Sequence, residues 1–142
     1  DILNYSHNLK ETDPRTIFID IEIEETASEQ YTPIGLPFGV RIVTGNDYVY
    51  SGGNLSYFNT GKNSMLKGTH KFAITVESTV ETSKMYYLGN VYAINPRTAI
   101  GSYHYDPRTT YAKGGHGKMK LNRAMLWNRV LTEQEITKLM EV

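Results

Sequence analysis

The sequence lacks cysteine and has a single tryptophan, Trp127. Without cysteine there is no disulfide framework and no thiolate metal site. The formal net charge is zero, from 15 basic and 15 acidic residues, which argues against a bulk electrostatic partner such as nucleic acid or an anionic membrane. No apolar run is long enough to span a bilayer, so we expect no membrane insertion.

The 142 residues fit one domain, residues 1–142, with room for a sizeable core. The chain begins at Asp1 rather than at methionine, and we therefore expect that it is excised from a larger protein. What it has in abundance is tyrosine, with 11 residues. Tyrosine suits both strands and half-exposed contact surfaces.

Alternation of apolar and polar residues predicts a chain made mainly of short strands. Residues 16–24 place four isoleucines on one face of a strand, and residues 69–78 place Phe72, Ile74 and Val76 on one face of another. The dipeptides Gly52-Gly53 and Gly89-Asn90 predict two-residue hairpins. The other predicted strands are residues 38–44, 47–51, 54–60, 84–88, 91–94 and 97–105, and the long predicted loops are residues 26–37 and 106–117.

The end of the chain predicts a strand followed by the only convincing helix. Residues 119–127 are mostly apolar, so we expect a largely buried strand with Trp127 in the core. In residues 132–139, Thr132 and Glu135 form a capping box. Ile136, Leu139 and Met140 give the helix one apolar face. A short helix cannot bury such a face alone, so we expect it to pack on a sheet.

This end also resembles a known signature. It combines a glycine and a short apolar strand with an aromatic-Asn-Arg-x-Leu-Thr-x-x-Glu-Ile pattern, here Gly117-Lys118-Met119-Lys120-Leu121 and Trp127-Asn128-Arg129-Val130-Leu131-Thr132-Glu133-Gln134-Glu135-Ile136. The pattern resembles the close of laminin-G-like, concanavalin A-like jelly rolls. Together with about nine predicted strands, it implies an all-β fold, a two-sheet antiparallel jelly-roll sandwich with one short C-terminal helix. In a jelly roll the first strong strand and the last would lie near each other.

Tyrosines mark the predicted contact surface. Tyr48 and Tyr50 share one strand face and Tyr57 lies across the hairpin, while further candidates gather in or beside the long loop, namely Tyr103, His104, Tyr105, Asp106, Arg108 and Tyr111. Flat rings stack on the C–H faces of sugars, while carboxylates and guanidinium groups take the hydroxyls. The structural alternative is that many of these tyrosines are half-buried sheet residues.

We therefore predict a non-catalytic carbohydrate-binding, lectin-like module of a surface, secreted or phage tail-associated adhesin. Its partner would be a glycan or cell-surface polysaccharide, and its location extracellular, at a cell surface or on a virion. The first alternative is a protein-interaction or structural domain that docks on neighbouring domains of the same protein.

The second and less favoured alternative is a glycoside hydrolase that uses Glu22 or Glu24. Alternation places Asp20, Glu22 and Glu24 on one strand face, with neighbours about 7 Å apart. The strand resembles the Glu-x-Asp-x-Glu strand of some bacterial endo-glucanases, with the first two acidic types swapped and without the tryptophans of a glucan cleft. A solvated strand face with a charged edge explains the same pattern and is favoured over catalysis.

Metal sites have little support in the sequence. The four histidines, His7, His70, His104 and His116, do not pair at metal-ligand spacing. Calcium is left open because related jelly rolls often hold it in loops, and the candidates here are Asn46, Asp47 and Asp106. We expect no other cofactor.

Overall fold

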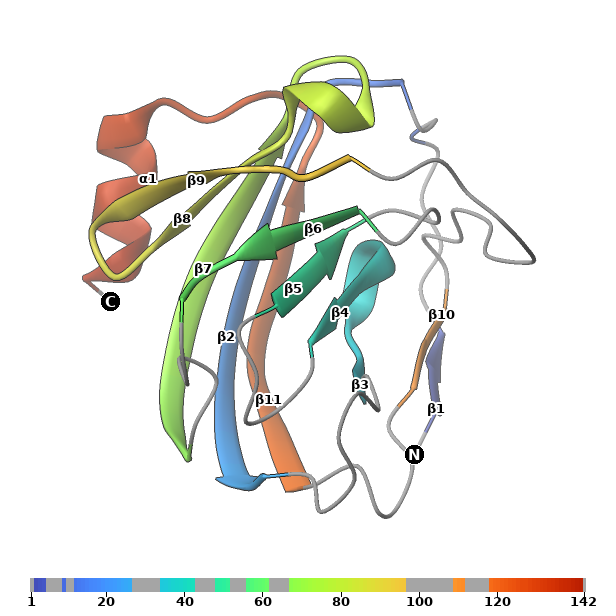
Figure 1. The fold of residues 1–142 in the computed structure, drawn as a ribbon, viewed down its shortest axis with the longest axis vertical. Helices are drawn as coiled ribbons and strands as arrows, with labels where there is room; N and C mark the ends of the chain where they lie inside the picture. The colour runs from blue at the N-terminus through green and yellow to red at the C-terminus, as the bar shows by residue number, and fades with distance from the viewer. Residues whose placement is uncertain are drawn as a thin grey trace.

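The computed structural model describes residues 2–4, 9, 12–26, 34–42, 48–51, 56–61, 67–96, 109–111 and 118–141. This part of the chain is mostly β, as the alternation predicts (Figure 1). Its eleven strands are β1 Ile2–Asn4, β2 Arg15–Glu25, β3 Ile34–Gly35, β4 Val40–Ile42, β5 Tyr48–Ser51, β6 Ser56–Asn59, β7 Gly68–Val76, β8 Lys84–Tyr87, β9 Asn90–Ala93, β10 Thr109–Tyr111 and β11 Lys118–Trp127. Two 3-10 turns, Pro37–Gly39 and Val80–Thr82, and one helix, α1 Glu133–Met140, complete the described elements.

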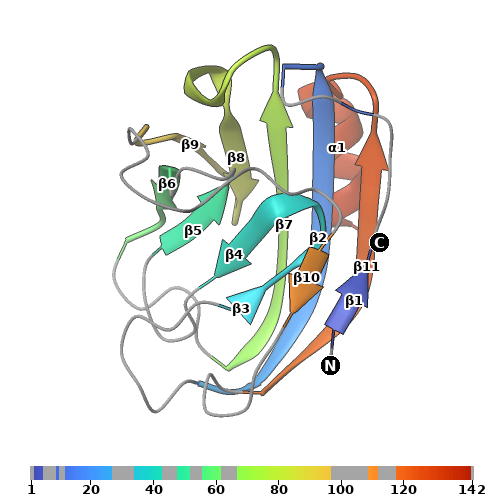
Figure 2. The ribbon, with the colours of Figure 1, turned by 90° about the vertical axis from the view of Figure 1, so that its right-hand side faces the viewer.

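Two antiparallel sheets form a β-sandwich. The five-stranded sheet has the order β11-β2-β7-β8-β9, the four-stranded sheet the order β3-β4-β5-β6, and β1 pairs separately with β10. Figure 2 shows the layers, with the four-stranded sheet on one side of the five-stranded sheet and α1 on the other. The two-sheet arrangement with a C-terminal helix is therefore confirmed.

The core between the sheets follows from the isoleucine alternation in β2. Ile17, Ile19, Ile21 and Ile23 are 0–2% exposed, because their β-branched side chains all point from one face of the strand. They pack with residues of both sheets, including Phe72, Ile74 and Val76 of β7 and Val40, Ile42, Val49 and Phe58 of the four-stranded sheet. The predicted faces of β2 and β7 are thus confirmed.

The first long strand and the last one lie side by side. β11 pairs antiparallel with β2, from Met119 opposite Ile23 to Trp127 opposite Thr16. This pairing of distant segments confirms the proximity expected from the sequence, and it gives the fold a high contact order.

The position of β11 at the edge of its sheet corrects a prediction. The strand has a neighbour on one side only, and its side chains are exposed or half-buried rather than largely buried. A register shift between Leu121 and Arg123 marks a β-bulge, which breaks the period of two. Trp127 therefore lies on the outer face beside α1, where it packs against a small cluster of Phe18, Ala73, Leu131 and Ile136. It is half-buried there, so the prediction that it is a core residue is wrong.

Helix α1 begins and packs as predicted. The Thr132 side chain accepts a hydrogen bond from the Glu135 backbone N–H, and the Glu135 carboxylate accepts one from the Thr132 N–H. These bonds satisfy two donors that a helix start otherwise leaves open. Ile136 and Leu131 are buried with Phe18 and Ala73 in the cluster between α1 and the five-stranded sheet.

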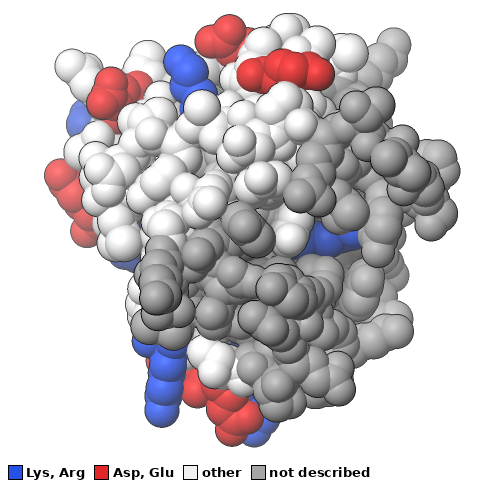
Figure 3. Space-filling view, viewed as in Figure 1, with Lys and Arg blue, Asp and Glu red and all other residues white. Residues whose placement is uncertain are grey.

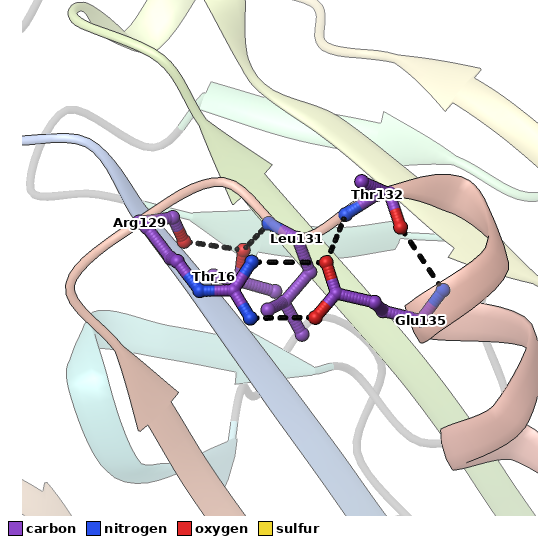
Figure 4. Close-up of polar contacts among 5 residues, drawn as sticks. All are labelled: Thr16, Arg129, Leu131, Thr132 and Glu135. Carbon is purple, nitrogen blue, oxygen red and sulfur yellow. Dashed lines mark hydrogen bonds and ion pairs between the residues drawn. The ribbon is translucent and has the colours of Figure 1, made fainter.

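A buried threonine ties the segment before α1 to β2 (Figure 4). The Thr16 hydroxyl donates to the Arg129 carbonyl oxygen at 2.9 Å and accepts from the Leu131 backbone N–H at 2.9 Å. Arg129 in turn donates to both carboxylate oxygens of Glu135. The Arg129 hydrogen bond, followed by the Thr132 N–H bond, lowers the pKa of Glu135 to about 2.

Both hairpins form, but their turns differ from the prediction. Ser51 pairs with Ser56, so four residues separate the strands rather than the two predicted at Gly52-Gly53. In the second hairpin Tyr87 pairs with Asn90, which makes Leu88-Gly89 the two-residue turn in place of Gly89-Asn90. Leu88 and Gly89 have φ values of 52° and 75°, as a type I′ turn requires.

Two predicted segments have a different structure. The strand predicted from residue 38 begins only at Val40 of β4, because Phe38 has a φ of 66° within the turn Pro37–Gly39, a conformation that a strand does not use. The loop predicted at residues 106–117 contains β10, which pairs with β1. Residues 97–108, with the strand predicted at 97–105, lie outside the described part.

Candidate functional site

A row of side chains crosses the outer face of the four-stranded sheet. Arg41 of β4 lies opposite Tyr50 of β5, Tyr50 lies opposite Tyr57 of β6, and Tyr57 forms a further bridge with Asn95. The residues that flank this row, Val40, Ile42, Val49 and Phe58, are buried between the sheets. Because side chains alternate along a strand, Arg41, Tyr50 and Tyr57 point away from the core. We call Arg41, Tyr50, Tyr57 and Asn95 the tyrosine row.

The geometry of the tyrosine row is set by backbone pairing. The ring centroids of Tyr50 and Tyr57 lie 6.3 Å apart with planes tilted by 57°, which is within the range of aromatic pairs. The Tyr57 N–H donates to the Asn95 carbonyl oxygen at 3.1 Å, and the Asn95 N–H donates to the Tyr57 oxygen at 2.7 Å. Arg41, Tyr50 and Tyr57 are half-buried and Asn95 is exposed.

This row combines the groups that a sugar requires. Aromatic rings offer flat apolar surface with a hydroxyl at the end. The guanidinium group of Arg41 is a fixed donor and the amide of Asn95 is both donor and acceptor. A shallow surface of this composition can stack on the C–H face of a ring and bind its hydroxyls, without any nucleophile or general base.

The surface around β9 is poor in charge. Figure 3 shows white, uncharged residues gathered over β6, β8 and β9, with most acidic and basic side chains at the rims and one blue side chain at the right-hand border of the white area. Among the described residues next to the tyrosine row, Asn95 and Pro96 are exposed. Arg41 is the charged member of the tyrosine row, so a neutral ligand would desolvate this one charged side chain of the row.

The structure brings together part of the predicted contact set. Tyr50 and Tyr57 lie in the tyrosine row. Tyr48 and Tyr111 belong to β5 and β10, but their side chains lie outside the described part. The remaining candidates lie in residues that the structure does not describe, namely Tyr103, His104, Tyr105, Asp106 and Arg108.

The sequence prediction missed Arg41 and Asn95. Arg41 lies between two buried residues, Val40 and Ile42, so alternation alone could have placed it on the outer face. Asn95 could not be found in this way, because only the bridge to Tyr57 places it beside β6.

The three carboxylates of β2 have unequal surroundings. Glu22 and Glu24 are exposed, as a solvated strand face requires, whereas Asp20 is only 7% exposed. The Asp20 carboxylate lies 3.5 Å from Arg123 Nε and accepts a hydrogen bond from Asn122 at 3.3 Å. β2 lies between β11 and β7, so the prediction of a charged edge strand is wrong.

His70 is a buried partner of Tyr87. The His70 Nδ1 and the Tyr87 hydroxyl lie 2.7 Å apart, and the two side chains are 9% and 2% exposed. Burial, followed by the nearby Tyr92, raises the pKa of Tyr87. The other histidines, His7, His104 and His116, lie outside the described residues.

The described ranges contain neither a cluster of metal-binding side chains nor a membrane-spanning helix. No group of three His, Cys, Asp or Glu side chains within them could hold a metal ion. The calcium candidates Asn46, Asp47 and Asp106 belong to segments that the structure does not describe. The described part also contains no helix of the length and apolarity needed to cross a membrane.

Comparison with family models, with curated proteins and with solved structures gives no match for this chain.

Proposed function

We propose that the chain is a non-catalytic carbohydrate-binding module, with a jelly-roll topology of the laminin-G-like, concanavalin A-like type. The pairing of the first long strand with the last one, in a two-sheet sandwich with a capped C-terminal helix, supports this topology. Such a module would act within a surface, secreted or phage tail-associated adhesin, outside the cell or on a virion.

The proposed glycan binding rests on the tyrosine row. Two rings and a guanidinium group lie on directly paired strands at one face of the sheet, and a backbone bridge places the amide of Asn95 beside them. Backbone pairing fixes their spacing before any ligand arrives, so little conformational entropy is lost on binding. The ligand that fits is a neutral pyranose unit of a glycan, which stacks on Tyr50 or Tyr57 and donates or accepts at Arg41 and Asn95.

The test is binding to a panel of immobilised polysaccharides, measured by biolayer interferometry. We expect at least one neutral polysaccharide to bind with a Kd in the micromolar to millimolar range. Tyr57→Ala should weaken that binding by about tenfold, the equivalent of about 1.4 kcal/mol. Tyr57→Phe should keep most of the affinity, because it retains the stacking surface.

A matched control is available in Tyr86. This tyrosine is half-buried like Tyr57 but lies on the other outer face, beside α1. With folding of each variant verified by circular dichroism, Tyr86→Ala should bind as tightly as the unmodified chain. Absence of binding to every polysaccharide at millimolar concentration would reject the proposal and favour a protein-interaction domain that docks on its neighbours.

A further inference from the structure

The tryptophan that the sequence places in the core lies at a surface hollow. After the β-bulge between Leu121 and Arg123, each residue of β11 points to the face opposite to the one that strict alternation would give it. Ala124 and Leu126 then pack against the core between the sheets, and Trp127 packs on the opposite side, beside α1. β-Bulges commonly re-aim side chains next to functional sites.

The hollow lies between the end of β11 and α1. Its volume is about 420 Å³, and its lining residues are Trp127, Leu131, Glu135, Lys138 and Leu139. Trp127, Leu131 and Leu139 make one side apolar, while Glu135 and Lys138 supply the charged groups. The hollow is wide open to solvent, so it would hold one face of a ligand, and the half-buried indole offers a stacking surface there.

The charged groups of the hollow leave one net positive charge. Both oxygens of the Glu135 carboxylate accept hydrogen bonds from Arg129, and one of them also accepts from the Thr132 N–H. Arg129 therefore neutralises Glu135. The Lys138 ammonium makes no hydrogen bond or ion pair with the described residues, and the Trp127 indole N–H makes no hydrogen bond with them.

The hollow combines an apolar wall with hydrogen-bond donors that have no partner among the described residues. These two features indicate which chemical groups a ligand needs. A neutral sugar would require acceptors as well as donors, and the acceptor capacity of Glu135 is largely used by Arg129 and Thr132. A carboxylate matches the ammonium of Lys138 through charge-assisted hydrogen bonds. A six-membered ring with an axial C–H face matches the indole.

We propose that this hollow binds a hexuronate residue, a sugar ring that carries a carboxylate. The ring stacks on Trp127 and its carboxylate pairs with Lys138. The site is separate from the tyrosine row, because Trp127 lies on the outer face of the five-stranded sheet and Tyr57 on that of the four-stranded sheet. It would let one module contact two units of a glycan that contains acidic sugars.

The experiment uses the fluorescence of Trp127, the only tryptophan in the chain. Sodium glucuronate, glucose and sodium acetate are titrated separately, with ionic strength held constant by sodium chloride. We expect a saturable fluorescence change with glucuronate, at a Kd about tenfold below that of glucose or acetate, since only glucuronate combines ring and carboxylate. Equal responses to the three probes, or no saturable response to glucuronate up to tens of millimolar, would overturn the proposal.

Two lysine variants and one tyrosine variant complete the test. Lys138→Gln should weaken glucuronate binding by about tenfold and leave the glucose response unchanged. Lys120→Gln is the matched control, because Lys120 is also exposed on the outer face of β11 but does not line the hollow. Equal losses of glucuronate affinity in the two lysine variants would show that the effect comes from net charge and not from a site at Lys138, and would contradict the proposal. Tyr57→Ala should keep full glucuronate binding. The proposal for the tyrosine row and the proposal for the hollow can therefore be rejected independently of each other.

Discussion

Thr16→Val removes one buried hydroxyl that joins the first long strand to the C-terminal segment. Thr16 is 0% exposed, and its hydroxyl donates to the Arg129 oxygen and accepts from the Leu131 N–H, both at 2.9 Å. Valine has nearly the same shape, so the substitution leaves packing in place and acts on the hydrogen bonds. It tests whether this polar contact, rather than apolar packing alone, holds the segment against β2.

The magnitude follows from the two bonds. Loss of the bond to the Arg129 oxygen, which lies in a partly exposed setting, costs about 1 kcal/mol, and a buried N–H at Leu131 without an acceptor costs about 1–3 kcal/mol. We therefore expect the free energy of unfolding to fall by about 2–4 kcal/mol. With a urea m-value of about 2 kcal/mol per M, the midpoint falls by about 1–2 M.

The assay is equilibrium urea unfolding followed by circular dichroism and Trp127 fluorescence. Thr75→Val is the matched control, because Thr75 lies opposite Thr16 on β7 and is 3% exposed, while its hydroxyl makes no hydrogen bond with the described residues. The control should shift the free energy of unfolding by less than about 1 kcal/mol. If Thr16→Val costs no more than Thr75→Val, apolar packing and not the two hydrogen bonds of Thr16 holds the segment against β2.

Three further predictions concern the helix and the β8–β9 turn. The pKa of the Glu135 carboxyl is lowered from 4.5 to about 2, so its ionised form stabilises the fold above pH 4.5 and this contribution is lost as the pH falls toward 2. In thermal unfolding, Glu135→Gln should therefore lose less stability than the unmodified chain between pH 4.5 and pH 2. The same pH dependence in both proteins would contradict this role of Glu135. Leu88 is 74% exposed and has a φ of 52°, a conformation that asparagine adopts at lower cost than leucine. Leu88→Asn should therefore raise the free energy of unfolding in urea by about 1 kcal/mol, and a decrease would count against backbone strain at this position. Ile136 is 2% exposed, so Ile136→Asp should lower the free energy of unfolding by about 3 kcal/mol or more. The exposed Gln134→Asp should change it by less than about 0.5 kcal/mol, and similar losses for the two would contradict the packing of α1.

Local patterns in the sequence were enough to predict the strongest elements. The isoleucines of β2 alternate over a whole strand, and a one-residue slip would expose all of them, so the buried face is determined by the sequence itself. α1 carries its own start signal in Thr132 and Glu135, and its apolar face repeats at helical spacing. The presence of a sandwich follows from many such strands with one late helix.

Features that depend on neighbouring strands could not be predicted in the same way. An apolar strand looks alike at the edge and in the middle of a sheet, and β11 was therefore expected to be buried. The bulge puts Leu121, Ala124 and Leu126 on one face although their spacing breaks the period of two. In the sequence, residues 124–127 are all apolar, so no alternation there indicates which face Trp127 takes.

The candidate site was predictable only in part. Tyr50 and Tyr57 follow from the hairpin, but a two-residue turn would have paired Tyr50 with Leu55. The four residues between the paired serines instead bring the two tyrosines opposite each other. Asn95 joins them through a long-range bridge, and no local pattern reports such a contact.

Glycan binding by the tyrosine row can be observed at the rings themselves, by aromatic NMR of the chain titrated with an oligosaccharide from a polysaccharide that it binds. We predict that ring signals of Tyr50 and Tyr57 shift with saturation on titration, and that those of Tyr86 stay unchanged. Shifts confined to rings other than Tyr50 and Tyr57 would contradict the claim.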